Sequence, residues 1–134
     1  MIQWDEKFEL GIDSIDEQHK KWVSIMNQLF ESEGNQTDQS EFIFTQLEQV
    51  NAYAKFHFNH EETLFKKYKY ANESAHLLLH REWEQELLQY IIDAATGKIP
   101  QASVLLKDME EWLHNHICVE DKKYVEFFKS KGVL

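Results

Sequence analysis

KFHFNHEETLF, the stretch from Lys55 to Phe65, sets the pattern for the rest of the chain. His57 and Glu61 lie four residues apart, and four residues of an α-helix rotate by about 400°, so the two side chains emerge on nearly the same side. Apolar residues before and after this pair continue one stripe at steps of three and four, which predicts a buried helix face. An unpaired carboxylate in such a core position needs a proton, a partner or a metal ion. We therefore expect other parts of the chain to supply that partner.

Three other segments predict helices whose buried stripes also contain histidine. The histidines in register with these stripes are His19, His76, His80 and His116. His60 and His114 lie off the stripes, so we interpret them as groups at the surface or behind a site, and Glu62 as part of a solvated face. A single core histidine is usually a structural residue, but five of the seven histidines stand in core register here. This pattern indicates a metal site.

Capping signals predict where two of the helices begin. Ser14 with Glu17 has the form of a capping box, so the first helix is expected to begin near Ile15. Asp38 with Glu41 offers a second capping box before the long helix that contains His57.

Other boundaries follow from composition. The long helix should end within 66–70, the third helix should begin at 72–74, and Pro100 suits the first turn of the fourth. Residues 1–13 carry apolar side chains at mostly even spacing, which predicts an extended arm packed across the other helices. Residues 120–134 predict a short final helix and a frayed tail.

Four amphipathic helices with short connections predict an all-α fold, an antiparallel up-down-up-down four-helix bundle with an N-terminal extended arm and a short C-terminal helix. We expect one domain over residues 1–134. In this topology the five core histidines, Glu61 and Asp121 fall toward one end of the bundle. Asp121 follows His116 by five residues, which is about 140° off its face in a straight helix. The two can meet one ion only if the helix ends or bends between them.

Composition argues against several classes of protein. The chain has 24 acidic and 14 basic residues, a net charge of −10, and Arg81 is its only arginine, so nucleic acid is not an expected partner. Cys118 is the one cysteine, so it forms no intrachain disulfide and is expected to be a small buried filler. The first residues lack the features of a signal peptide, and no segment approaches the roughly 18 apolar residues of a membrane span. We expect a cytoplasmic protein.

Four motifs together resemble the hemerythrins, specifically their bacterial single-domain form. These motifs are IDEQH at 15–19, HFNHEE at 57–62, HLLLH at 76–80 and WLHNHICVED at 112–121. The resemblance covers nearly the whole chain, and it implies two non-heme iron ions joined by a bridging oxo or hydroxo group. The implied ligands are His76, His80 and His116 to one iron, His19 and His57 to the other, and Glu61 and Asp121 as bridges.

The resemblance also implies reversible O2 binding at the iron that has only two histidines. Donor counting agrees, because five histidines, two bridging carboxylates and one bridging oxygen fill all but one position on two six-coordinate ions. Imidazole and carboxylate donors suit iron better than calcium or magnesium. We expect Leu113, with Trp22 or Ile117, to shield the open position from water, because a residue one turn before a ligand leans toward the metal layer.

Two other classes of function remain open. The same site in an enzyme or repair protein would reduce nitric oxide or peroxide, or donate iron to damaged clusters. In a sensor, O2 or iron occupancy would change a contact with a partner protein. Oxygen-activating di-iron bundles carry Glu-x-x-His pairs on two helices, and this chain has none on its stripes, so we favour a binding protein over an enzyme. We expect a monomer that binds O2, with an oxygen-consuming enzyme as the hypothetical recipient.

Overall fold

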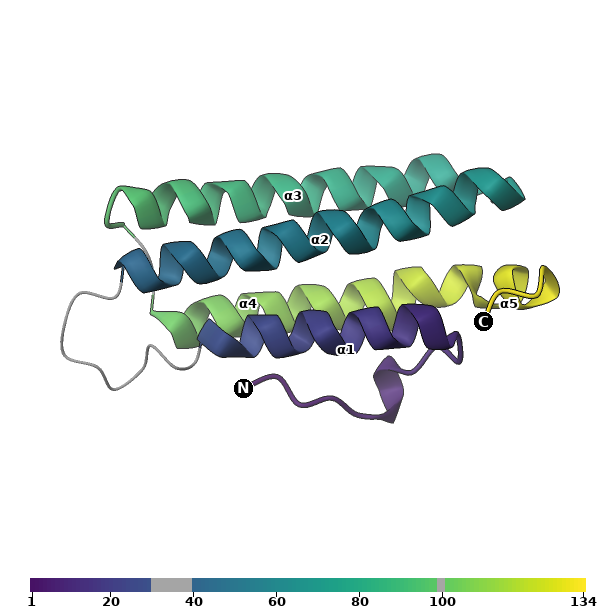
Figure 1. The fold of residues 1–134 in the computed structure, drawn as a ribbon, viewed down its shortest axis with the longest axis horizontal. Coiled ribbons are helices and arrows are strands. Elements are labelled where there is room, and N and C mark those ends of the chain that lie inside the picture. The colour runs from purple at the N-terminus through teal and green to yellow at the C-terminus, as the bar shows by residue number, and fades with distance from the viewer. Residues whose placement is uncertain (30–39, 99–100) are drawn as a thin grey trace.

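The computed structural model describes residues 1–29, 40–98 and 101–134, and every regular element in these ranges is helical. Four long helices run alternately in opposite directions, which confirms the predicted all-α up-down-up-down bundle (Figure 1). They are α1 (Asp13–Asn27), α2 (Ser40–Tyr68), α3 (Glu73–Ala95) and α4 (Ala102–Asn115). The shorter elements are the 3-10 turn η1 (Glu6–Phe8), the π-helix η3 (His116–Asp121) and α5 (Lys122–Ser130).

The core forms where the apolar stripes of the four helices meet. In Figure 1, α2 lies beside α3, and α1 lies beside α4. Each helix contributes side chains that are almost completely buried, including Trp22, Leu47, Trp83 and Met109. Burial of such large apolar side chains stabilises the bundle by about 1.5–3 kcal/mol each. The side chains that fill the core are therefore those that the periodicity of three and four predicts.

The predicted capping box of α1 is wrong. The helix begins at Asp13, Ile12 occupies the N-cap, and no side chain caps it. The buried carboxylate of Asp16 instead accepts hydrogen bonds from the backbone N–H groups of Leu10 (2.9 Å) and Gly11 (3.0 Å). Gly11 has a φ of +80°, a left-handed conformation that a residue with a Cβ rarely adopts. The turn before the helix is therefore stabilised by a side chain from inside α1. The other predicted capping residue, Asp38, lies outside the described residues.

The N-terminal arm runs along α1, as Figure 1 shows, but it is not extended throughout because it contains η1. Its apolar side chains at Ile2, Phe8 and Leu10 are buried against the bundle. Asn27, at the far end of α1, donates to the carbonyl of Ile2 at 2.9 Å and accepts from its N–H at 2.8 Å. The two ends of α1 therefore both contact the arm.

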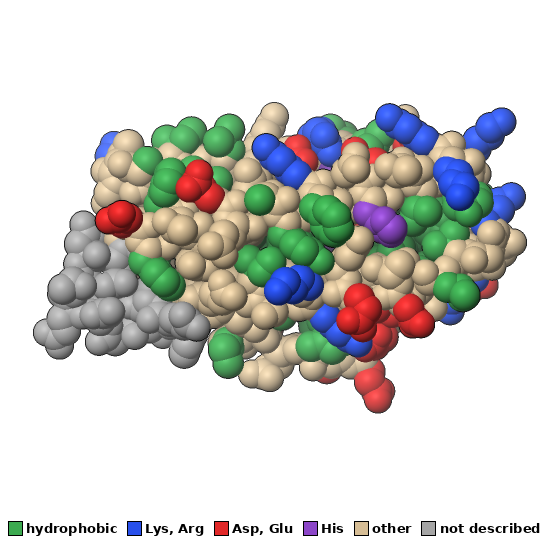
Figure 2. All heavy atoms as spheres, in the orientation of Figure 1, with side chains coloured by type: hydrophobic (Ala, Val, Ile, Leu, Met, Phe, Trp, Pro, Cys, Tyr) green, Lys and Arg blue, Asp and Glu red, His purple; other side chains and the backbone are tan. Residues whose placement is uncertain are grey.

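The end of α2 and the start of α3 fall within the predicted ranges. Lys69, directly after α2, has a φ of 57° and so ends the helix in a left-handed residue. Across the described residues, no helix is both long and apolar enough to cross a membrane. Figure 2 shows acidic and basic side chains on the same face, interspersed with apolar and uncharged groups.

Candidate metal centre

The seven side chains predicted as ligands come together at one end of the bundle. They come from the first half of α1, the second half of α2, the first half of α3 and the π-helix η3 between α4 and α5, which lie toward the same end in Figure 1. Each of the seven is at most 2% exposed. A layer of five imidazoles and two carboxylates therefore lies inside the core.

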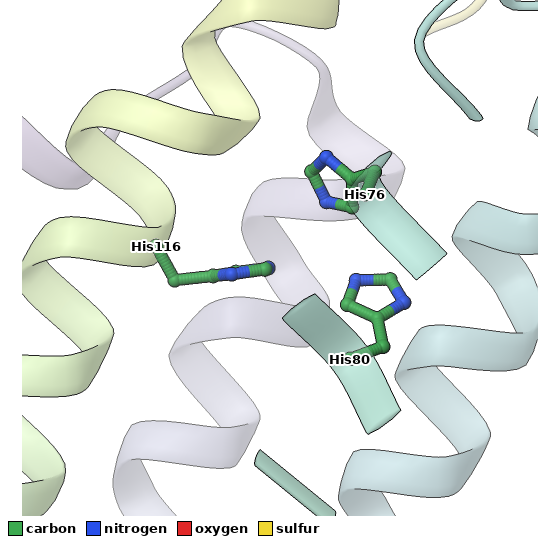
Figure 3. Close-up of side chains that lie close together, drawn as sticks. All are labelled: His76, His80 and His116. Carbon is green, nitrogen blue, oxygen red and sulfur yellow. The ribbon is translucent and has the colours of Figure 1, made fainter. Parts of the chain in front are cut away.

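These residues form two groups. The first contains His76, His80 and His116, whose rings converge from α3 and from η3 in Figure 3. The second contains His19, His57, Glu61 and Asp121. Within each group, every residue places one ligand atom within 4.8 Å of the corresponding atoms of the others. This spacing suits two separate cations.

Glu61 lies between the two groups. Its Oε1 contacts Nε2 of His57 and lies 4.0 Å from Nε2 of His19. Its Oε2 lies 3.5 Å from Nε2 of His76, in the other group. The carboxylate therefore presents one oxygen to each group.

Asp121 bridges the groups from the opposite wall. Its Oδ1 lies 3.0 Å from Nε2 of His76 and 3.1 Å from Nε2 of His116, while its Oδ2 lies 3.3 Å from Nε2 of His19. The π-helix η3 provides this orientation, because it contains both His116 and Asp121. The bend that the sequence analysis required between these two residues is thus a π-helical turn.

The donor atoms fit two cations because most of them have no hydrogen-bond partner. Both oxygens of Glu61 and of Asp121, and Nε2 of each histidine in the three-histidine group, are buried without one. Without a cation these buried atoms have only one another as partners, at poor hydrogen-bond geometry, which is costly in a core. The Nε2 atoms of His19 and His57 also face one another at 3.0 Å, a contact that a shared proton or cation stabilises. A set of nitrogen and carboxylate-oxygen donors suits iron.

Ionisation in the metal-free site follows from burial and mutual attraction. Burial and the charge of Asp121 oppose ionisation of Glu61, but the attraction of His57 and the close contacts with His57 and His76 outweigh them and lower its pKa. Burial likewise opposes ionisation of Asp121, and the histidines around it lower its pKa well below the usual value. Burial disfavours the charged form of His76, but both carboxylates favour it and raise its pKa to about 10. Burial lowers the pKa of His19 and of His80.

Two residues that the sequence pattern does not predict lie behind the histidines. Nδ1 of His57 donates to the amide oxygen of Gln18 at 2.8 Å. Nδ1 of His80 donates to Oε2 of Glu62 at 2.8 Å, so the interpretation of Glu62 as a purely solvated group is wrong. Both residues adjoin a predicted ligand in the chain but point toward a neighbouring helix. Core periodicity alone gives no signal for them.

Aromatic rings enclose the histidines. Phe58 stacks on His80 with ring centroids 3.8 Å apart, and Trp112 stacks on His116 at 4.4 Å. Neither aromatic residue is among those that the sequence pattern predicts for the site. The three residues predicted to shield the site, Trp22, Leu113 and Ile117, are completely buried. Trp22 lies 5.6 Å from the ring of His57, centroid to centroid.

The residues expected to lie outside the site do so. His114 is exposed and its ring meets the edge of Phe8, while His60 is half-buried, and neither belongs to the two groups. Cys118 is half-buried, so the expected buried filler is only partly correct, and its thiol donates to the carbonyl of Lys7 at 3.3 Å.

Several known proteins are similar to this chain in sequence and in fold. Residues 10–128 match the family model described as the hemerythrin HHE cation binding domain. A bacteriohemerythrin of Clostridium acetobutylicum is 30% identical over 131 residues, which cover 94% of this chain and 100% of the relative. A hemerythrin-like protein of Naegleria gruberi is 29% identical over 133 residues, covering 99% and 93%. A crystal structure of wild-type hemerythrin superimposes with a TM-score of 0.84 at 25% identity, covering 94% of this chain and 96% of that chain.

Proposed function

Because this chain belongs to the hemerythrin family, we propose that it binds dioxygen reversibly at a site of two non-heme iron ions. One observation carries the proposal: Glu61 and Asp121 each present one carboxylate oxygen to each of the two histidine groups. In this proposal His76, His80 and His116 hold one iron, His19 and His57 hold the other, and the two carboxylates bridge them.

The donor set and its charge support iron. Two ferrous ions offset by two carboxylates and one bridging hydroxide leave a single net positive charge in the core. Five imidazoles favour a transition metal over calcium or magnesium, which prefer oxygen donors. When bound, the iron pair supplies an open coordination position and reversible two-electron chemistry for O2.

The protein's own residues keep that position dry. Trp22, Leu113 and Ile117 are completely buried, so bulk water does not reach them in this structure. The indole N–H of Trp22 donates to the carbonyl of Val50 at 3.2 Å, which leaves no free polar group on this side chain. An apolar, water-excluding wall favours release of O2 unchanged, because protons that would drive further reaction do not reach it.

The optical spectrum of the iron-loaded protein tests this function. We expect the anaerobically reduced protein to develop a visible charge-transfer band when O2 is added and to lose the band when the solution is flushed with argon. A band that never forms, or one that decays to an oxidised product without releasing O2, would contradict reversible binding. Steady turnover of nitric oxide or peroxide would indicate an enzyme instead.

A further inference from the structure

Two histidines of the centre have outer hydrogen-bond partners that differ in charge. His57 donates from Nδ1 to the neutral amide of Gln18, whereas His80 donates from Nδ1 to the carboxylate of Glu62. Both N–O distances are 2.8 Å. The two groups of ligands are therefore supported by bonds of similar length but different electrostatic character.

The bond to Glu62 determines how His80 faces the centre. A carboxylate only accepts hydrogen bonds, so Nδ1 of His80 carries the proton and Nε2 keeps its lone pair. That Nε2 is buried without a partner, and in Figure 3 the ring lies among those of His76 and His116. Phe58 covers the flat side of the ring at 3.8 Å and restricts its rotation. His80 is thus held in the tautomer that a metal ligand requires.

Arg81 holds Glu62 in turn. The guanidinium Nη2 of Arg81 donates to the same Oε2 of Glu62 that receives the proton of His80. Its Nε also lies 3.4 Å from Glu84. Arg81 is the only arginine among 14 basic residues, and a guanidinium stays charged at every physiological pH and binds carboxylates in a fixed geometry. The side chain of Glu62 is 18% exposed, so Arg81 helps to keep it turned toward His80 and away from water.

We propose that Glu62, held by Arg81, is a positioning residue that strengthens metal binding by the three-histidine group. This group shares the bridging carboxylates of Glu61 and Asp121 with the other group, and a charged partner on Nδ1 makes Nε2 of His80 a more basic donor. Gln18 orients His57 without adding charge. The inference rests on the proposed two-metal site, but not on O2 binding.

Zinc titration of the metal-free protein against a chromophoric chelator tests the proposal. We expect the wild type to bind two Zn²⁺ ions in two binding steps. The step that is lost in His80→Ala is the one that belongs to the three-histidine group. Glu62→Ala should weaken that same step about 10–100-fold, the range typical of lost outer-shell partners. Glu62→Gln keeps an acceptor oxygen but loses the charge, so it should fall between the wild type and Glu62→Ala.

Two matched variants sharpen the result. Gln18→Ala should weaken the other step, because it removes the partner of His57. Glu82→Ala removes an exposed carboxylate of the same helix, and it should leave both steps unchanged. Nitrogen-15 NMR of the metal-free protein should show His80 as the Nδ1–H tautomer in the wild type and a mixture of tautomers in Glu62→Ala.

The outcomes separate failure of this proposal from failure of the proposed function. Equal weakening of both steps by Glu62→Ala would indicate general destabilisation, and unchanged binding would show that Glu62 has no positioning role. A wild type that binds no zinc would reject the two-metal site itself. Zinc binding by the wild type without reversible O2 binding by the iron form would reject the proposed function and leave the role of Glu62 intact.

Discussion

Nε2 of His116 and Oδ1 of Asp121 lie 3.1 Å apart although the two residues are five positions apart in the chain. In a straight α-helix that separation rotates the second side chain about 140° away from the first. Here both residues belong to the π-helix η3, whose backbone hydrogen bonds join residues i and i+5. One wide turn therefore directs both side chains into the same core layer.

The π-helix predicts that substitution of Asp121 lowers the iron content far more than substitution of its neighbour Glu120. Asp121→Ala should lower the iron content from about two ions per chain to one or fewer, because both groups lose a carboxylate oxygen. Glu120 instead pairs with Lys123 at the surface at 2.9 Å, so Glu120→Ala should retain the wild-type iron content. A metal assay of protein loaded with iron measures both. Equal iron contents would refute the bridging role of Asp121.

The histidines divide into predicted ligands and matched controls. His57→Ala and His116→Ala should each lose iron, because each removes a nitrogen that faces a carboxylate of the centre. His114→Ala should retain iron because its side chain is exposed, and His60→Ala should retain it because the residue belongs to neither group. The measurement is iron per chain after identical loading. Loss of iron from His60→Ala as complete as from His57→Ala would show that the assignment on α2 is incorrect.

Metal binding should stabilise the fold. In the metal-free protein, five imidazoles and two carboxylates face one another in the core, where unpaired polar atoms are costly. An ion that binds only the folded chain adds about 4 kcal/mol at a thousand-fold excess over its Kd. Thermal unfolding with and without ferrous iron under anaerobic conditions measures the difference. Superimposable curves would contradict a buried metal site.

Stability of the metal-free protein should fall as the pH rises above neutrality. Burial opposes charge on His76, but the carboxylates of Asp121 and Glu61 outweigh it and raise its pKa to about 10. A raised histidine pKa stabilises the fold fully below the unfolded value of about 6.5, and this contribution is lost as the pH rises toward 10. The slope for one proton is about 1.4 kcal/mol per pH unit.

Urea unfolding between pH 6.5 and 10 measures this effect. His76→Gln removes the titrating ring, so its metal-free form should show a flatter pH dependence than the wild type over the same range. The two proteins would instead have parallel pH profiles if His76 were not the titrating group.

The pocket wall should control how long bound O2 survives. Leu113→Ala should leave the iron content intact, because it removes no ligand, and should accelerate autoxidation by admitting water. Leu105→Ala is a matched control, since Leu105 is equally buried on α4 but lies further from the histidines in the chain. Both substitutions should destabilise the fold by about 2–5 kcal/mol. Decay of the O2-dependent absorption band distinguishes them, and equal decay rates would show that Leu113 is ordinary core.

Periodicity in the amino-acid sequence was enough to predict the four-helix bundle. Steps of three and four placed the core histidines on buried stripes, and antiparallel topology then required them to lie at one end. The end of α2 at Tyr68 and the start of α3 at Glu73 were predicted as well, because their short connection is marked by a change in composition. Six of the seven candidate ligands stand on these stripes, whereas Asp121 lies off the face of His116 in a straight helix and meets it only through the π-helix. The role of all seven in binding metal is the prediction that the iron assays test.

Features that depend on contacts between segments could not be predicted in this way. Ser14 and Glu17 have the form of a capping box, yet Asp16 stabilises the turn because the arm folds back over the start of α1. The partners Gln18 and Glu62 became evident only when neighbouring helices were packed together. A stripe encodes which face of a helix is buried. Which atom of another helix meets that face depends on the helix offsets, on the ring orientations and on a single π-helical turn, all of which packing determines.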